Sequence, residues 1–244
     1  MNWFESWFNS KYYHKLYKNR DSKEAEKFIN NLVSKLNLKE NSNLIDIACG
    51  KGRHARYFNK KGLNVTGVDL SQNSINYASN FTTQTLSFHV HDMRRSFKKN
   101  YFDIATNLFT SFGYFEKKEE DLLALKAMAK NLKKNGILII DFMNTEKILK
   151  NLISHEEKYI DNIKFSIKRY IENNIIIKEI KITDEKKQYN FLESVRNIKL
   201  NDFKKMISKS NLRIIDMFGD YELNEFNIKY SDRLILVCKK QSTN

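Results

Sequence analysis

Three aspartates in the first half of the chain are the side chains best suited to binding a ligand. Each ends or nearly ends a short apolar segment with the length and composition of a buried strand. The three are Asp46, Asp69 and Asp92, and their segments begin at Leu44, Val65 and Leu86. The carboxyl ends of parallel strands meet at one edge of an open α/β sheet, where ligands bind in such folds. We therefore expect the three carboxylates to line one site that binds a cation or accepts hydrogen bonds.

A glycine turn follows the first of these strands. Residues 44–52 read Leu-Ile-Asp-Ile-Ala-Cys-Gly-Lys-Gly, and the two glycines predict a tight turn before a helix. The spacing Gly50-x-Gly52-x-x-Ala55 also fits the pattern of dinucleotide-binding folds. A pyrophosphate favours bare amides at a helix N-terminus, and a carboxylate at the end of the strand would repel it. Asp46 therefore favours a positively charged ligand over a nicotinamide dinucleotide.

S-adenosylmethionine meets this requirement because it carries an ammonium and a sulfonium and no phosphate. Asp69, at the end of the second strand, is suitably placed to accept hydrogen bonds from both ribose hydroxyls. Asp92, after the third strand, is placed to accept a hydrogen bond from the adenine amino group. A nicotinamide-dependent oxidoreductase stays as an alternative, and it predicts binding of NAD instead.

Five segments resemble, in order and spacing, the successive motifs of class I S-adenosylmethionine-dependent methyltransferases. They are Leu44–Gly52, Val65–Ser71, His91–Arg94, Phe102–Leu108 and Gly136–Asp141. Five motifs in register are far more specific than any one of them, and together they cover roughly residues 40 to 145. The segment Phe109–Tyr114 is further similar to small-molecule N-methyltransferases, including those that act on amino sugars. The resemblance implies a Rossmann-like seven-stranded sheet, mostly parallel with an antiparallel last strand, and helices on both faces.

The resemblance also implies the cofactor, S-adenosyl-L-methionine, with S-adenosyl-L-homocysteine as its product. Its binding residues are expected in the N-terminal helix, in the glycine turn and at the ends of the second, third and fourth strands. They are Tyr17, Arg20, Asp46, Ala48, Cys49, Gly50, Gly52, Asp69, Leu70, Asp92, Met93, Asn107 and Leu108. We expect Arg20 to pair with the carboxylate of the methionine end and Leu70 to flank the adenine.

Methyl transfer from a sulfonium is an in-line displacement. The protein mainly has to hold the acceptor lone pair about 3 Å from the methyl carbon and to exclude water. An ammonium acceptor must also lose a proton to a base within hydrogen-bond reach. Tyr114 is the catalytic candidate, because the resembling N-methyltransferases place a His or another polar aromatic residue there. Since Tyr replaces His, Tyr114 is predicted either to act as the base, to orient the acceptor, or only to pack its loop.

Five further residues are candidates for binding the acceptor. They are Tyr13, Phe109, Phe112, Glu193 and Arg196. Strand alternation places Glu193 and Arg196 on opposite faces of a strand, so a solvated surface pair is the alternative interpretation for them. Asp141 and Asn144 follow the fifth strand, but the additional acid of a magnesium site is missing after the fourth strand, and no metal is expected.

Helical spacing in residues 2–18 places six apolar or aromatic side chains on one stripe and predicts one amphipathic helix. They are Trp3, Phe4, Trp7, Phe8, Tyr12 and Leu16. We expect residues 1–38 to form a helical lid over the cofactor. Simple packing of the aromatic side chains onto the domain and binding to a membrane surface are the alternatives.

Alternating strand and helix signals assign residues 39–150 and 201–240 to the methyltransferase core. Residues 151–200 instead alternate apolar and polar side chains and predict an inserted antiparallel β meander, which forms a roof or a dimer contact. Its three predicted strands are 163–171, 175–183 and 189–200. The expected assembly is a monomer or a homodimer.

The composition bounds the remaining alternatives. The net charge of +14 suits nucleic acid, but the basic residues are scattered through every segment, which argues against such a partner. Cys49 and Cys238 are expected to be far apart and reduced. No segment has the length of a membrane span or the apolar region of a signal peptide, so a cytoplasmic location is expected.

The sequence thus predicts a cytoplasmic S-adenosylmethionine-dependent methyltransferase that acts on a small molecule, more at nitrogen than at oxygen. The alternative is an RNA-directed methyltransferase, or a basic RNA-binding protein that retains the fold. The two differ in one observable property, because RNA binding would weaken steeply with salt and survive loss of the cofactor site.

Overall fold

The computed structural model describes residues 3–17 and 22–241, which group into two compact units. Of the described residues, the larger unit contains 22–147 and 198–241, and the smaller unit contains 3–17 and 148–197. Each unit is described by itself. None of the helices in the described ranges is long and apolar enough to cross a membrane.

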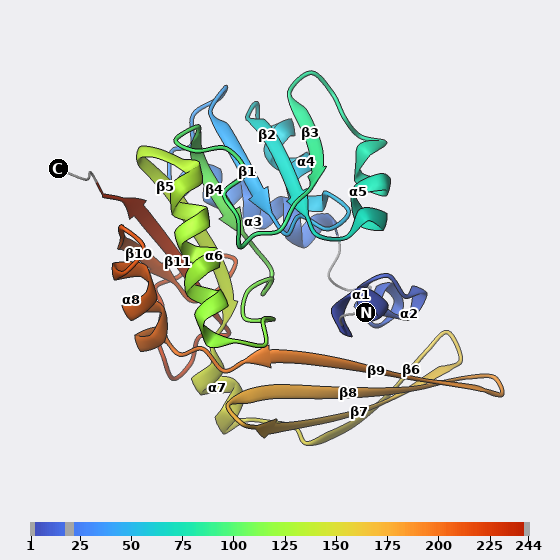
Figure 1. The fold of residues 1–244 in the computed structure, drawn as a ribbon. Coiled ribbons are helices and arrows are strands. Elements are labelled where there is room, and N and C mark those ends of the chain that lie inside the picture. The colour runs from blue at the N-terminus through green and yellow to red at the C-terminus, as the bar shows by residue number, and fades with distance from the viewer. Residues whose placement is uncertain (1–2, 18–21, 242–244) are drawn as a thin grey trace. The chain divides into compact units, whose positions relative to one another are not determined.

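One seven-stranded sheet forms the centre of the larger unit (Figure 1). Its strands are β1 (Asn43–Ile47), β2 (Asn64–Asp69), β3 (Leu86–Val90), β4 (Phe102–Asn107), β5 (Leu132–Met143), β10 (Leu212–Phe218) and β11 (Arg233–Lys240). Their order across the sheet is β10-β11-β5-β4-β1-β2-β3. The strands from β5 to β3 pair in parallel, whereas β11 pairs antiparallel with both β5 and β10. The predicted Rossmann-like sheet with an antiparallel last strand is confirmed.

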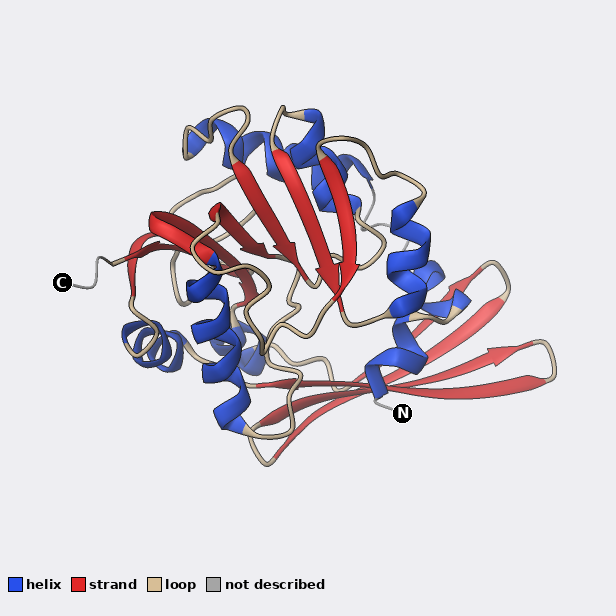
Figure 2. Cartoon of the chain, turned by 45° about the horizontal axis from the view of Figure 1, so that its top comes forward, coloured by secondary structure: helices blue, strands red, loops and turns tan. Residues whose placement is uncertain are grey.

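Helices cover both faces of this sheet (Figures 1 and 2). They are α3 (Ser22–Lys35), α4 (Arg53–Lys60), α5 (Gln72–Ser79), α6 (Lys118–Asn131) and α8 (Leu200–Ser208). Apolar side chains of α3, α4 and α5 join those of β1, β2 and β3 in one core cluster. Helices α6 and α8 contact each other and pack against β4, β5 and β10.

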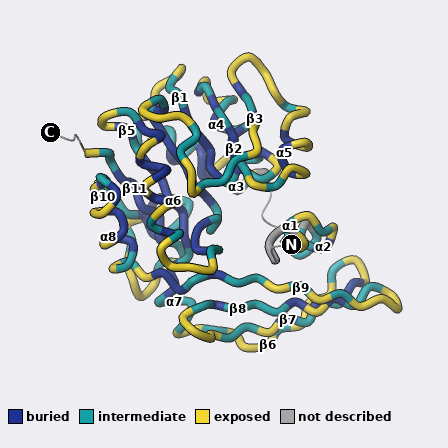
Figure 3. The backbone as a smooth tube through the Cα atoms, in the orientation of Figure 1, coloured by how far each residue is buried: buried dark blue, intermediate teal, exposed yellow. Residues whose placement is uncertain are grey.

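The central strands are buried along most of their length (Figure 3). Leu138, Ile139 and Ile140 of β5 have no exposed surface, because neighbouring strands flank β5 on both sides and helices cover both faces. A strand buried on both faces requires an uninterrupted apolar run. Ile137 to Ile140 supply it, and the same rigid frame positions the polar residues that follow.

The smaller unit contains a four-stranded antiparallel sheet in the order β6-β7-β8-β9. Its strands are β6 (His155–Ile160), β7 (Ile163–Glu172), β8 (Ile175–Asp184) and β9 (Lys187–Arg196), with helices α1 (Trp3–Phe8) and α2 (Lys11–Leu16) packed on them, and α7 (Thr145–Lys150) precedes β6. Asn173 and Asn174 connect β7 to β8 with φ values of 49° and 63°. Positive φ at both central residues is the requirement of a two-residue type I′ hairpin, and Asn tolerates it well.

Two predicted elements were wrong in detail. The single helix over residues 2–18 is two short helices, because the side chain of Ser10 caps α2 by accepting a hydrogen bond from the Tyr13 amide. The meander has four strands rather than three, since β6 precedes the predicted runs, and its last strand ends at Arg196 instead of residue 200.

Two leucines of α6 provide a matched test of this packing. Leu125 has no exposed surface, whereas Leu123 on the same helix is 52% exposed. We expect Leu125→Ala to lower the free energy of unfolding by about 2–5 kcal/mol, because it removes core contacts and leaves a cavity. Leu123→Ala is expected to change it by less than about 0.5 kcal/mol. Urea unfolding of both variants measures the difference, and equal losses would contradict the described core.

Candidate functional site

The turn between β1 and α4 forms the centre of the candidate site. Ala48, Gly50 and Gly52 all have left-handed backbone conformations, with φ values of 59°, 55° and 78°. A Cβ on Gly52 would lie 2.6 Å from the Phe88 ring, so only glycine fits there. A Cβ on Gly50 would meet no atom within 4 Å. The backbone of the turn therefore packs closely against β3 on one side and leaves open space at Gly50.

Asp69 ties this turn to the end of β2. One carboxylate oxygen accepts a hydrogen bond from the Gly50 amide and the other accepts one from the Ser71 amide, both at 2.8 Å. Burial raises the pKa of Asp69, while these two hydrogen bonds oppose the rise. A carboxylate has about four lone-pair sites, so Asp69 can still accept two more hydrogen bonds. This capacity matches the pair of ribose hydroxyls expected from the sequence.

Asp46 lies one strand away and is almost completely buried, with 1% of its surface exposed. Its Oδ1 accepts a hydrogen bond from the Thr106 hydroxyl at 2.8 Å, whereas its Oδ2 has no hydrogen-bond partner among the described residues. Burial raises the pKa of Asp46 from 3.8 to about 7, despite the opposing hydrogen bond from Thr106. A buried, unpaired carboxylate oxygen is costly, and a cation placed beside it would remove that cost.

Asn107 supplies a second unpaired acceptor on the neighbouring strand. Its Nδ2 donates to the Ile47 carbonyl at 3.0 Å, which fixes the amide, and its Oδ1 is buried without a partner in the described part of the chain. β1 and β4 are parallel, and Asp46 is opposite Thr106 in their register. The two unpaired acceptors therefore lie at the same edge of the sheet. Thr106 was not predicted from the sequence.

The other expected cofactor residues differ in how far they are exposed. Leu70 is 44% exposed after β2, as an apolar wall for a ligand would be, whereas Cys49 and Leu108 are 8% and 3% exposed. Asp92 and Met93 follow β3 and are half-buried. The carboxylate of Asp92 is bound by the guanidinium of Arg94, with Nε 3.0 Å from each oxygen. Burial would raise the pKa of Asp92, but the hydrogen bonds and the charge of Arg94 hold that pKa below its usual value.

The loop after β4 contains the residues expected to contact the acceptor. Phe109 is half-buried, and Tyr114 donates a hydrogen bond from its hydroxyl to the Thr110 carbonyl. Phe112 requires a correction, because it has no exposed surface and packs on Phe203 of α8 with the ring centroids 5.7 Å apart. Phe112 is a core residue that anchors the loop, so it is not available to bind a substrate.

An ion pair that was not predicted from the sequence, between Asp141 and Arg233, holds the loop after β4. Asp141 of β5 is fully buried and accepts hydrogen bonds from the Phe109 amide at 2.8 Å and from Arg233 Nε at 2.8 Å. The hydroxyl of Tyr221 donates to the same carboxylate at 3.1 Å. Because β11 is antiparallel to β5, its first residue, Arg233, reaches the edge where β5 ends. The sequence predicted an antiparallel last strand, and that strand was the signal that could have placed Arg233 at this edge of the sheet.

The remaining expected residues lie in the smaller unit or outside the described residues. Glu193 accepts hydrogen bonds from Trp7 Nε1 and from the Tyr17 hydroxyl, both at 2.6 Å. Tyr13 packs edge-on against Trp7, with the ring centroids 5.6 Å apart. Arg196 is half-buried, and strand alternation places it on the other face of β9 from Glu193. Glu193 is therefore not part of a solvated pair with Arg196. Arg20 lies outside the described residues.

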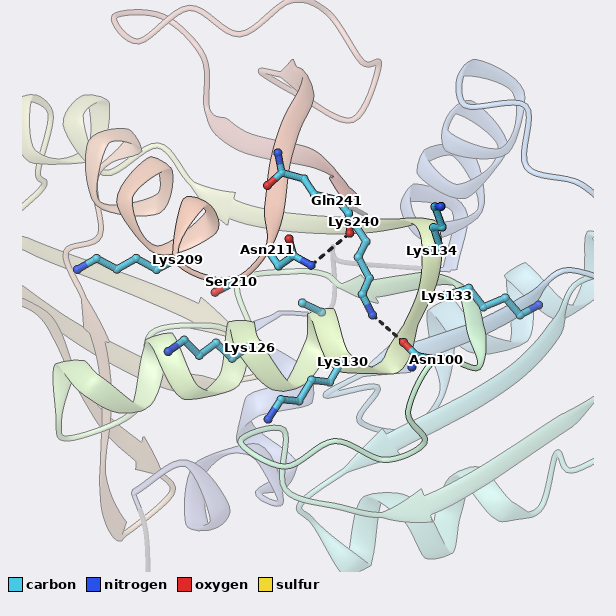
Figure 4. Close-up of a pocket in the computed structure, with 11 residues that line it drawn as sticks. Asn100, Lys126, Lys130, Lys133, Lys134, Lys209, Ser210, Asn211, Lys240 and Gln241 are labelled. Atoms are coloured by element: carbon cyan, nitrogen blue, oxygen red, sulfur yellow. Dashed lines mark hydrogen bonds between the residues drawn. The ribbon is translucent and has the colours of Figure 1, made fainter. Parts of the chain in front are cut away.

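A hollow of about 720 Å³ lies at the opposite edge of the larger unit's sheet (Figure 4). It is lined by six lysines, Lys126, Lys130, Lys133, Lys134, Lys209 and Lys240. Figure 4 shows most of their ammonium groups pointing outward rather than toward one another. Lys130 and Lys209 lie where α6 and α8 end, and cations are favoured at helix C-termini. This hollow is separate from the strand-end residues, and we assign it no part in the candidate site.

Comparison with known proteins agrees with this geometry. Residues 45–140 match a family model described as a methyltransferase domain. A dTDP-3-amino-3,4,6-trideoxy-alpha-D-glucopyranose N,N-dimethyltransferase of Streptomyces venezuelae is 29% identical over 102 residues. That alignment covers 42% of this chain and 43% of the relative, so the chain spans less than half the length of this curated relative.

Solved structures share the fold over almost the whole chain. An S-adenosylmethionine-dependent methyltransferase from Clostridium acetobutylicum ATCC 824 superposes with a TM-score of 0.80 at 24% identity, covering 94% of this chain and 96% of that one. The amino pentose methyltransferase CalS10 from Micromonospora echinaspora, described with S-adenosylmethionine bound, has a TM-score of 0.73 at 15% identity over 95% and 98% of the two chains. At these identities the likeness concerns the fold.

The raised pKa of Asp46 predicts a pH dependence of stability. The folded protein holds the Asp46 proton up to about pH 7, whereas the unfolded chain releases it near pH 4. Stability is therefore fully present below the unfolded pKa and is lost as the pH rises through the folded pKa, by up to about 4 kcal/mol in the ligand-free protein. Asp46→Asn stays neutral and should show a shallower fall between pH 4 and 7.

Urea unfolding at several pH values measures this difference between the wild-type protein and Asp46→Asn. Glu119→Gln is the control, because Glu119 is an exposed carboxylate in the first turn of α6. That variant is expected to keep the wild-type slope. Parallel curves for the wild type and Asp46→Asn would show that Asp46 is ionised in the folded protein at neutral pH.

Proposed function

We propose that this chain, whose residues 45–140 match a family model described as a methyltransferase domain, transfers a methyl group from S-adenosylmethionine to a small-molecule acceptor. The observation that carries the proposal is the carboxylate of Asp46, which is buried beside the glycine turn with one oxygen unpaired among the described residues. The ammonium of the methionine moiety is a cation that would pair with it. A pyrophosphate at this position would meet a carboxylate instead of a donor.

Four residues of the larger unit would hold the cofactor. Asp46 Oδ2 and Asn107 Oδ1 are buried acceptors that need donors. Asp69 already accepts one hydrogen bond at each oxygen and has capacity for two ribose hydroxyls. The open space at Gly50 allows a ligand to approach the backbone of the turn. These residues fit S-adenosylmethionine, which would supply an electrophilic methyl group on a positively charged sulfur.

The acceptor in this proposal is an amine. From a neutral amine, transfer would form a bond between the amine nitrogen and the methyl carbon and would break the bond from that carbon to sulfur, which would keep the electron pair. The methylated nitrogen would then carry the positive charge and would lose a proton to solvent. The hydroxyl proton of Tyr114 is already donated to the Thr110 carbonyl, so the phenol oxygen can accept a hydrogen bond from the acceptor N–H. Tyr114 therefore orients the acceptor and does not act as the base, because a neutral phenol has no tendency to take a second proton.

Nitrogen is favoured over oxygen as the acceptor by two supports. The Streptomyces venezuelae relative is described as an N,N-dimethyltransferase of an amino sugar, and the loop Phe109–Tyr114 resembles that class. A role on RNA has no comparable support, and the lysine-lined hollow lies at the far edge of the sheet from Asp46.

Calorimetric titration with S-adenosylhomocysteine tests the proposal. We expect the wild-type protein to bind it with a dissociation constant in the micromolar range, as is usual for a small ligand held by a few charge-assisted contacts. Asp46→Asn should weaken binding by about tenfold to a hundredfold, because it removes the charge that pairs with the ammonium. NAD should not bind.

Asp103→Asn is the matched control for this titration. Asp103 is an aspartate of β4 near the strand's other end, and it pairs with Lys133 at 2.8 Å. Its replacement should leave the affinity unchanged. The proposal fails if the wild-type protein does not bind at millimolar ligand, or if Asp46→Asn binds as tightly as the wild type.

A further inference from the structure

The backbone of the loop after β4 is strained at two consecutive positions. Phe109 and Thr110 have φ values of 66° and 59°, in the left-handed region that favours glycine. Side chains other than Gly, Asn and Asp rarely adopt it, and for a β-branched residue such as Thr it is a clear outlier. Such strain persists only where surrounding contacts enforce it, and it is concentrated at functional sites.

Contacts from two strands enforce this conformation. The carboxylate of Asp141 accepts the Phe109 amide at 2.8 Å, and its backbone carbonyl accepts the Thr110 amide at 2.9 Å. Arg233 donates to the Thr110 hydroxyl at 2.8 Å through the same guanidinium that pairs with Asp141 at 2.7 Å. Both residues of the strained pair are therefore held at the backbone, and Thr110 is also held at its side chain.

The ion pair itself is largely buried. Asp141 has no exposed surface and Arg233 has 18%. Burial alone would lower the pKa of Arg233, but the Asp141 carboxylate beside it raises that pKa above its usual value. The hydroxyl of Tyr221 donates to Asp141. The ring centroid of Tyr221 lies 5.6 Å from the guanidinium carbon of Arg233. Breaking such a pair is costly, because removing either partner leaves the other charge largely buried without its partner.

The side chain of Phe109 connects the loop after β4 to the residues that follow the glycine turn. The ring of Phe109 lies 5.0 Å from the guanidinium carbon of Arg53 and 6.1 Å from the ring of His54. These are the first two residues of α4, directly after Gly52. Burial and the neighbouring Arg53 lower the pKa of His54 to about 3, so it is a neutral ring at physiological pH. The conformation of Phe109 thus bears on the turn that carries the proposed cofactor site.

We propose that Asp141 and Arg233 are positioning residues that keep Phe109 and Thr110 in the left-handed conformation, and thereby hold the Phe109 ring against the start of α4 beside the cofactor turn. This inference rests on the proposed function. It assigns a role to residues of β5 and β11, and it makes the loop after β4 a determinant of cofactor affinity.

A double-mutant cycle measured by titration with S-adenosylhomocysteine tests the inference. Arg233→Lys keeps the charge but loses the fork that holds Asp141 and Thr110 together, and Phe109→Ala removes the ring. Each is expected to weaken binding about tenfold. Because both act through the same ring contact, the double variant should be no weaker than the weaker single variant. Tyr221→Phe removes one donor to Asp141 and should weaken binding about threefold. This milder variant still tests the inference if Arg233→Lys does not fold.

Two controls separate positioning from simple loss of stability. Leu125→Ala destabilises the same unit by removing a buried side chain of α6, and it should keep the wild-type affinity. Arg213→Lys changes an exposed arginine of β10 and should also keep it. If the wild type binds and the effects of Arg233→Lys and Phe109→Ala multiply, or if neither has an effect, the inference fails while the proposed function stands. If the wild type does not bind, both fail.

Discussion

The burial of one carboxylate with an unsatisfied oxygen is the constraint on which the rest of the site depends. Asp46 is held within β1, between β2 and β4, and is 1% exposed, so water does not solvate it. The Thr106 hydroxyl satisfies one oxygen, and no described residue satisfies the other. A buried polar atom without a hydrogen-bond partner is destabilising, and a ligand that supplies the partner would remove that cost. The pKa of about 7 follows from the same burial, and a cationic ligand would lower it.

Parallel strand register explains why this carboxylate has useful neighbours. Asp46 pairs with Gly67 of β2 and with Thr106 of β4, so Asp69 and Asn107 follow at the same edge, two residues and one residue beyond its partners. The antiparallel strand β11 brings Arg233 to that edge from the opposite chain direction. Backbone hydrogen bonding of a buried sheet therefore fixes the relative positions of these polar groups before any ligand is bound.

Much of this could be predicted from sequence, because the signals were local. The apolar runs, the glycines and the aspartates that follow predicted the parallel strands and the turn, and five motifs in register predicted the sheet. The long-range contacts had no local signal. Nothing in the segment around Asp141 shows that Arg233 would pair with it, and Phe112 has the same local pattern as an exposed loop aromatic, although α8 buries it. The break of the N-terminal helix at Ser10 depended on one capping hydrogen bond, which outweighed a continuous aromatic stripe.

Proton release on ligand binding tests the central claim most directly. If Asp46 is about half protonated at pH 7 in the free protein, pairing with an ammonium should expel roughly half a proton per S-adenosylhomocysteine bound. Calorimetry at pH 7 in two buffers of different ionisation enthalpy measures that number. The account predicts this release for the wild type and its loss in Asp46→Asn. Binding with no proton release, or with the same release in both proteins, would contradict it.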